Sequence, residues 1–144
     1  MLSIVVLLVD DEIPFVETLS KRIGKRGVSV KGVHSGLEAL EELSRNHTID
    51  VVILDVKMPG MDGIETLKEI KHNFPLVEVI MLTGHATVQS AIDGMKLGAF
   101  DYLMKPCEID LLIAKVDEAK TKKSNHEQKI LEAKAKSIAD RRGD

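Results

Sequence analysis

Four strand-like apolar runs of this chain end on residues whose side chains bind cations or phosphoryl groups. With the polar residues that follow them, the runs are 4–9 before Asp10 and Asp11, 51–54 before Asp55, 77–82 before Thr83, and 100–104 before Lys105. Runs rich in Val, Ile and Leu are typical of strands buried on both faces of a parallel sheet. In an open parallel sheet, ligands bind outside the carboxyl ends of the strands. Three carboxylates, a hydroxyl and an ammonium are therefore expected at one spot, which suits a divalent cation and a phosphoryl group.

The composition narrows the class of protein. The 144 residues are enough for one domain with a sizeable core and too few for two ordinary domains. The net charge of −3 gives no overall basic field, which argues against direct nucleic-acid binding by this chain. Cys107 is the only cysteine, so no internal disulfide can form. The opening apolar run is cut off by Asp10, so it reads as neither signal peptide nor membrane span. We expect a cytoplasmic protein without a membrane partner.

Segments of helical period lie between the apolar runs. Ser35, Asp62 and Thr87 stand where N-caps of three of these helices are expected. Pro106 is placed where a last helix begins, and residues 28–33 form a further short strand. Strands and helices therefore alternate five times, which predicts a parallel sheet with helices on both faces.

The composition changes beyond Ala119. Residues 120–129 contain no strongly apolar side chain, and apolar residues return only weakly after Ile130. We therefore predict one domain over residues 1–119 and a helical extension or linker over residues 120–144. Two interpretations of this extension stay open: a solvated helix that frays, or a linker helix that pairs with another chain.

The acidic residues could serve structure alone. Asp10 or Asp11 could cap the first helix, and Asp55 could simply terminate a strand. Capping needs one carboxylate, however, and here two are adjacent. Carboxylates that lie close together repel one another unless a cation sits between them, and Mg²⁺ prefers such hard oxygen ligands. A carboxylate held at a metal can also act as a nucleophile toward phosphorus.

Thr83, Tyr102 and Lys105 carry weaker signals when each is taken alone. Thr83 precedes a glycine, as in many turns, Lys105 could be solvated, and Tyr102 could be core packing. Next to the acidic residues, a lysine ammonium could neutralise phosphoryl oxygens and a threonine hydroxyl could donate to one of them.

These motifs resemble one known family. The stretches that carry the resemblance are Val9-Asp10-Asp11-Glu12, Asp55 followed by Met58-Pro59-Gly60-Met61-Asp62-Gly63, then Thr83-Gly84 and Lys105-Pro106. Their order and spacing are similar to those of the receiver domain of bacterial two-component response regulators. The stretch from Thr83-Gly84-His85-Ala86-Thr87 through Gly98-Ala99-Phe100-Asp101-Tyr102 most resembles receivers of the nitrogen-regulation and symbiosis-regulator classes. The resemblance runs from about residue 3 to about residue 119.

Membership of that family would imply a flavodoxin-like doubly wound fold with strand order 2-1-3-4-5. It would imply that a histidine kinase or phosphotransfer protein phosphorylates Asp55. Mg²⁺ would be bound by Asp11, Asp55 and the backbone carbonyl of Lys57, with Asp10 acting mainly through water. Thr83 and Tyr102 would form the switch pair, and Lys105 would contact the phosphoryl group.

The same resemblance implies a phosphoacceptor that catalyses its own phosphorylation and dephosphorylation, rather than an enzyme acting on a separate substrate. It also allows a homodimer promoted by phosphorylation. Two other classes fit less well. A haloacid-dehalogenase-type phosphatase wants its second Asp two residues after the nucleophile, where this chain has Glu12 after Asp10. A flavodoxin-like FMN binder needs a phosphate-binding loop after the first strand, where this chain is acidic. A purely structural interaction module would require a degenerate site.

Overall fold

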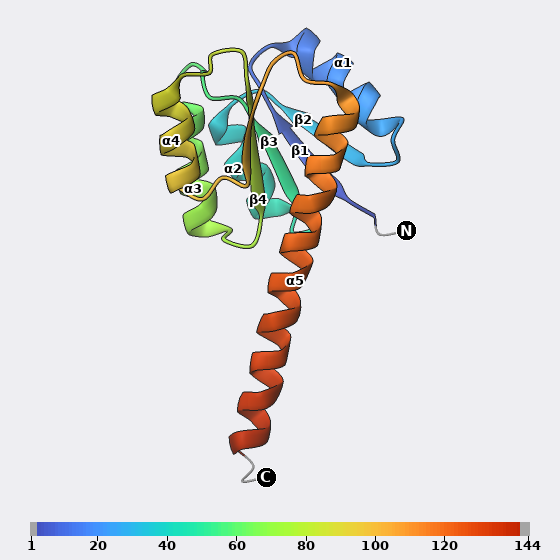
Figure 1. Ribbon diagram of the computed structural model, residues 1–144, viewed down its shortest axis with the longest axis vertical. Helices are drawn as coiled ribbons and strands as arrows, with labels where there is room; N and C mark the ends of the chain where they lie inside the picture. Colours follow the sequence, from blue (N-terminus) through green and yellow to red (C-terminus); the bar gives the residue numbers. More distant parts are fainter. Residues whose placement is uncertain (1–2, 142–144) are drawn as a thin grey trace.

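A computed structural model describes residues 3–141, which form a parallel sheet between two layers of helices (Figure 1). The strands are β1 (Val5–Val9), β2 (Ser29–Val33), β3 (Val51–Leu54), β4 (Glu78–Thr83) and β5 (Asp101–Met104). The helices are α1 (Ile13–Gly24), α2 (Gly36–Arg45), α3 (Gly63–Asn73), α4 (Val88–Lys96) and α5 (Ile109–Arg141). All strand pairs are parallel, in the order β2-β1-β3-β4-β5. The predicted flavodoxin-like architecture is confirmed.

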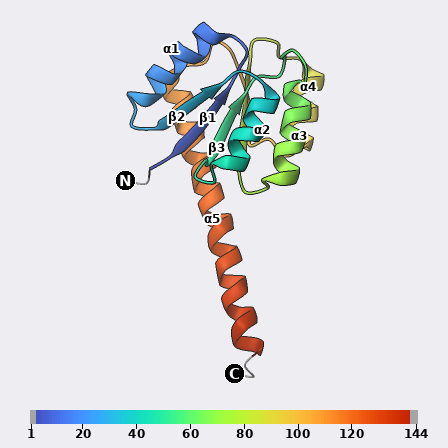
Figure 2. The ribbon, with the colours of Figure 1, turned by 180° about the vertical axis from the view of Figure 1, so that it is seen from behind.

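Alternate residues of the buried strands feed two separate cores. Leu7 of β1 points toward the layer of α2, α3 and α4, whereas its neighbour Leu8 points toward α1 and α5 (Figures 1 and 2). β1, β3 and β4 are buried on both faces, which explains why their sequences are continuously apolar. The two cores together hold the carboxyl ends of these strands in fixed positions.

The three expected N-caps are confirmed. Oγ of Ser35 accepts from the amide of Glu38 at 3.1 Å, and Oδ1 of Asp62 accepts from the amide of Glu65 at 2.8 Å. Oγ1 of Thr87 accepts from the amide of Ser90 at 3.0 Å. Each bond satisfies an amide that would otherwise lack a partner in the first helical turn.

The last helix starts later than predicted. α5 begins at Ile109, and not at Pro106. The amide of Lys105 still donates to the carbonyl of Thr83 at 2.9 Å, so strand pairing continues up to Lys105 and delays the helix.

The apolar stripe of α4 is largely exposed. Val88, Ile92 and Met95 have exposed fractions of 79%, 43% and 47%. Met104, at the end of neighbouring β5, is 64% exposed. Helical periodicity identified the helix correctly, but this apolar face is only partly covered by the described residues.

α5 continues well beyond the body of the domain (Figure 1). Its last buried residue is Lys123, and every residue from Gln128 to Arg141 is exposed. A boundary at Ala119 stays a prediction, because the helix crosses it without a break. Within residues 3–141, no helix combines the length and the apolar character needed to cross a membrane.

Candidate phosphoacceptor site

Backbone hydrogen bonds beyond the strand ends fix the positions of the site residues. The amide of Asp10 donates to the carbonyl of Val33 at 3.1 Å, and the amide of Asp55 donates to the carbonyl of Val9 at 3.1 Å. Ladder pairing therefore continues for one residue past β1 and β3. The two acidic residues are thus held by the sheet rather than by a free loop, with their side chains at its carboxyl edge.

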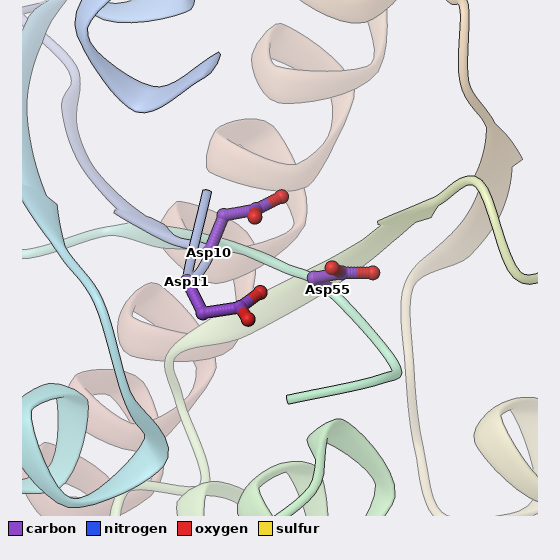
Figure 3. Close-up of side chains that lie close together, drawn as sticks. All are labelled: Asp10, Asp11 and Asp55. Carbon is purple, nitrogen blue, oxygen red and sulfur yellow. The ribbon is translucent and has the colours of Figure 1, made fainter. Parts of the chain in front are cut away.

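The three predicted carboxylates converge. One carboxylate oxygen each from Asp10, Asp11 and Asp55 lies within 4.8 Å of the others (Figure 3). Asp10 and Asp55 are buried, and Asp11 is exposed at the mouth of the site. Among the described residues, Oδ1 of Asp55 is buried without a hydrogen-bond partner. A buried carboxylate oxygen of this kind, beside two further carboxylates, has the donor chemistry that a hard divalent cation such as Mg²⁺ requires.

Lys105 brings the predicted ammonium into the site. Its Nζ lies 2.7 Å from Oδ2 of Asp10, 3.2 Å from Oε1 of Glu12 and 3.9 Å from Oδ2 of Asp55. The same Nζ lies 4.0 Å from the centroid of the Phe15 ring. Burial lowers the pKa of Lys105, but the hydrogen bond to Asp10 and the surrounding negative charges outweigh it and raise this pKa above its ordinary value. The lysine is therefore cationic and directed to the acidic cluster.

Asp10 has an electrostatically unfavourable environment. Burial raises the pKa of its carboxyl above the ordinary value, and the charge of Asp55 acts in the same direction. The hydrogen bonds from Lys105 and from the amide of Glu12, at 2.9 Å to Oδ1, offset this only in part. A bound cation would relieve the repulsion between these carboxylates.

Thr83 ends β4 and Lys57 follows β3, both at the carboxyl edge of the sheet. Thr83 is fully buried at the end of β4, and its Oγ1 accepts from the amide of His85 at 3.0 Å. Lys57 is exposed and lines a pocket of ≈ 470 Å³ together with Asp11 and Asp55. The pocket is open to solvent, as access for a phosphoryl donor requires.

Tyr102 lies in β5 and is directed toward α4. Its hydroxyl oxygen is 2.6 Å from Oγ of Ser90, a residue in the first turn of α4. The ring also packs near Gly94, where a Cβ would lie 3.6 Å from its Cδ2. Tyr102 is thus half-buried and tied to α4, and Oγ1 of Thr83 is engaged with its own loop.

Three contributing residues were missed from the sequence. Glu12 and Phe15 flank the ammonium of Lys105, and Ser90 holds the hydroxyl of Tyr102. Glu12 belongs to the acidic motif and had a visible signal. Ser90 had one too, since it stands three residues after the cap Thr87, a spacing at which reciprocal capping occurs. Phe15 had no signal in the sequence, because it reads as part of the apolar stripe of α1.

Comparisons with known proteins agree with this geometry. Residues 6–117 match the family model described as the response regulator receiver domain. The chain is 40% identical over 117 residues to the transcriptional regulatory protein ZraR of Escherichia coli K12, covering 81% of this chain and 26% of that protein. It is 40% identical over 112 residues to the DNA-binding transcriptional regulator NtrC of Klebsiella pneumoniae, covering 78% and 24%. The chain thus spans about a quarter of the length of these relatives.

Solved structures give the same result. A response regulator receiver domain protein from Clostridium thermocellum superposes with a TM-score of 0.80 at 37% identity, covering 84% of this chain and 97% of that one. A structure described as FixJ-N superposes with a TM-score of 0.77 at 30% identity, covering 84% and 96%. None of these matches supports the phosphatase alternative. The chain therefore belongs to the response regulator receiver domain family and serves in two-component signal transduction.

Proposed function

We propose that Asp55 is the phosphoacceptor of this receiver and that the other site residues prepare it for phosphoryl transfer. The observation that carries the proposal is the convergence of Asp10, Asp11 and Asp55 with Lys105 around the buried, unpartnered Oδ1 of Asp55. An oxygen that no protein donor occupies is free to attack phosphorus. The ammonium of Lys105 lies 3.9 Å from Oδ2, the other oxygen of the same carboxylate.

The transfer forms one bond and breaks another. A carboxylate oxygen of Asp55 attacks the phosphorus of a phosphohistidine on a histidine kinase or phosphotransfer protein, and the phosphorus–nitrogen bond breaks. The products are an acyl phosphate on Asp55 and the free imidazole of the donor. Hydrolysis of the acyl phosphate by water returns the carboxylate and releases inorganic phosphate. In both reactions the receiver catalyses a change of its own side chain.

The residues of the site would have different roles in phosphoryl transfer. Asp11, Asp55 and the carbonyl of Lys57 would hold Mg²⁺ directly, and Asp10 would act mainly through water. When bound, Mg²⁺ supplies charge that offsets the incoming phosphoryl oxygens. Lys105 already lies 3.9 Å from Asp55 and can neutralise a phosphoryl oxygen with little movement. Thr83 can donate its hydroxyl to another phosphoryl oxygen once the bond to the His85 amide no longer directs it.

The signal leaves the site through Thr83 and Tyr102. A phosphoryl group adds about two negative charges to the pocket. Movement of Thr83 toward that group would open space for Tyr102, whose bond to Ser90 couples it to α4. The exposed apolar face of α4 would then be presented differently to a partner, including a second copy of this chain. One relative is named a transcriptional regulatory protein and the other a DNA-binding transcriptional regulator, and the match covers only about a quarter of each, so we place the output outside the receiver. The cytoplasmic location stays a prediction.

Intact-mass measurement tests the acceptor. With Mg²⁺ and acetyl phosphate as donor, the chain should gain one phosphoryl group that survives acid and is lost in base. Asp55→Asn should gain none, whereas Asp62→Asn, which alters a nearby helix cap only, should be labelled normally. Undiminished labelling of Asp55→Asn would assign the acceptor to another residue.

A further inference from the structure

Two buried carboxylates lie at the end of the sheet opposite to the phosphoacceptor site. Asp50 directly precedes β3, Glu78 begins β4, and their side chains are 5% and 1% exposed. The amide of Glu78 donates to the carbonyl of Asp50 at 3.2 Å, so the two residues are neighbours on adjacent strands. Carboxylates at this depth require cationic or hydrogen-bonding partners.

One turn of α5 supplies most of the cationic partners. Nζ of Lys120 lies 2.9 Å and Nζ of Lys123 lies 3.0 Å from Oδ1 of Asp50. Nζ of Lys122 lies 3.6 Å from Oε1 of Glu78. These residues are close in sequence, and their side chains reach two points on the base of the sheet.

The rest of the body completes both carboxylate environments. Oδ2 of Asp50 accepts from the amide of Val5 at 2.9 Å, so both of its oxygens are satisfied. Oε1 of Glu78 lies 3.7 Å from Nζ of Lys71, and this Nζ also donates to the carbonyls of Pro75 and Val77, each at 2.9 Å. Neither oxygen of Glu78 has a hydrogen-bond partner among the described residues. Glu78 is therefore held by charge alone, between one lysine of the body and one of α5.

We propose that this lysine turn, residues 120–123, docks on Asp50 and Glu78 and thereby fixes the direction of residues 124–141 relative to the sheet. Lys123 is the last buried residue of α5, so the lysine turn is where the helix leaves the body. Beyond it, every residue from Gln128 to Arg141 is exposed.

The physical argument concerns specificity rather than net stability. The apolar contacts of Leu112, Val116 and Ala119 hold α5 against the sheet, but apolar burial is not directional. Buried ion pairs contribute little net stability, yet a buried charge that loses its partner is costly. A swing of the helix would separate Asp50 from both of its lysines, and Glu78 from Lys122. The ion pairs therefore favour this direction of α5 over other directions that the apolar contacts alone would allow.

A consequence follows for signalling, and it rests on the proposed function. Asp50, at the amino end of β3, is separated from Asp55, at its carboxyl end, by the length of the strand, about 16 Å at the usual strand rise. The elements expected to respond at the site are Thr83, Tyr102 and α4, and the docked lysines belong to none of them. We therefore expect residues 124–141 to keep their direction relative to the sheet when Asp55 carries a phosphoryl group, while α4 responds to it. We call this expectation the fixed arm.

Double electron–electron resonance measures this direction. Spin labels are attached to cysteines introduced at Glu41 on α2 and Ser137 on α5, both exposed, after Cys107→Ser. The starting protein should give one narrow distance distribution. Asp50→Asn combined with Glu78→Gln should at least double its width. Asp117→Asn combined with Glu132→Gln is the matched control, since these exposed acids of α5 make no ion pair among the described residues, and it should leave the width unchanged.

The lysine side gives an independent variant. Lys120→Gln combined with Lys123→Gln should broaden the distribution as the acid variant does. If circular dichroism shows that the acid variant is unfolded, the lysine variant becomes the test of docking. A folded lysine variant with the starting width would overturn the docking proposal. Beryllofluoride with Mg²⁺ then tests the fixed arm. Fluorine NMR reports its binding, so a failure to bind would contradict the proposed site alone. Bound beryllofluoride with a displaced distance distribution would overturn the fixed arm.

Discussion

The hydroxyl oxygen of Tyr102 lies 2.6 Å from Oγ of Ser90, which joins the last strand to the first turn of α4. Ser90 also exchanges bonds with the cap residue Thr87, at 3.0 Å and 3.1 Å. One serine therefore serves both the cap of α4 and the tyrosine proposed as a switch. A change in the position of Tyr102 must alter this bond, so the start of α4 is sensitive to it.

Tyr102→Phe should lower the free energy of unfolding by about 1 kcal/mol, because a net hydrogen bond is lost. Ser90→Ala should cost about 1–2 kcal/mol, since it also weakens the cap. The double variant should cost less than the sum, which urea denaturation measures. Ser44→Ala, at an exposed position of α2, serves as control and should change stability by less than about 0.5 kcal/mol. Additive effects of Tyr102→Phe and Ser90→Ala would mean that the two side chains are not coupled in solution.

Asp11→Ala should weaken Mg²⁺ binding more than Asp10→Ala does. Asp11 is exposed at the pocket, whereas both oxygens of Asp10 are engaged by Lys105 and by the amide of Glu12. We expect a loss of about tenfold or more for Asp11→Ala, equivalent to about 1.4 kcal/mol. A titration followed by NMR shifts near Asp55 measures it, with Glu17→Ala, an exposed acid of α1, as control. Equal affinities for the starting protein and Asp11→Ala would count against the assigned ligand.

Gly63→Ala should disturb the site through the backbone. A Cβ at Gly63 would lie 2.0 Å from the carbonyl oxygen of Asp55 and 2.6 Å from Cα of Val56, so the first turn of α3 or the acceptor loop must move. We expect a loss of about 2–3 kcal/mol of stability. Gly24→Ala, which meets nothing within 4 Å, should be neutral or slightly stabilising. Guanidinium denaturation compares the two, and equal stabilities would show that this close approach is relaxed in solution.

The fold was predictable because its signals are local. Apolar runs, caps such as Asp62 and the alternation of elements are each visible within a few residues, and parallel crossovers then leave few topologies. The convergence of Asp10, Asp55 and Lys105 followed from the strand ends. The contacts of Lys105 with Phe15, and of Tyr102 with Ser90, were not predictable in this way. They depend on side-chain directions across packed elements, which sequence spacing alone does not specify.

The ionic base of the sheet was equally hidden. Asp50 and Lys123 are 73 residues apart, and nothing local relates an acid before a strand to a lysine in a polar helix. Residues 120–129 read as a solvated surface because they lack apolar side chains. The structure buries Lys123 among them, since its charge is matched by Asp50. Pairing, rather than hydropathy, decides the burial of this lysine.

Asp50 should contribute stability that depends on pH. Burial raises the pKa of its carboxyl, but hydrogen bonds from the Val5 amide, Lys120 and Lys123 outweigh burial and lower this pKa below its ordinary value of 3.8. A carboxyl with a lowered pKa in the folded state stabilises the fold above its unfolded pKa. That stability is lost as the pH falls through the folded pKa.

Asp50→Asn should therefore lower the free energy of unfolding by about 3 kcal/mol near neutral pH, because it removes the buried carboxylate that pairs with Lys120 and Lys123. The difference between the starting protein and the variant should shrink as the pH falls below 3.8 and through the lowered pKa of Asp50 in the folded state, because Asp50 itself then becomes neutral. Urea denaturation across this range measures it, with Asp117→Asn as the exposed control. A difference that does not change with pH would mean that the ionised form of Asp50 is not the stabilising one.

The exposed apolar side chains of α4 predict how the chain associates. Val88, Ile92 and Met95 form an apolar face beside the proposed switch, whereas the extension carries apolar residues too sparsely for a good helical seam. We expect a mainly monomeric chain that dimerises more readily with beryllofluoride bound, through a surface that includes α4 and the part of α5 within the body. Ile92→Gln should abolish this dimer with little loss of stability, because its side chain is 43% exposed.

Sedimentation of the full chain and of a shortened version, each with and without beryllofluoride, separates α4 from the extension. The shortened version should end at Gln128, because ending at Ala119 would remove Lys120 and Lys123 and leave Asp50 buried without its lysines. Dimerisation of both versions with the mimic would place the contact on the body. Dimerisation of the full chain alone would place it on the extension. If the mimic binds and both masses stay unchanged, the coupling between the site and α4 is wrong, although Asp55 could still accept the phosphoryl group.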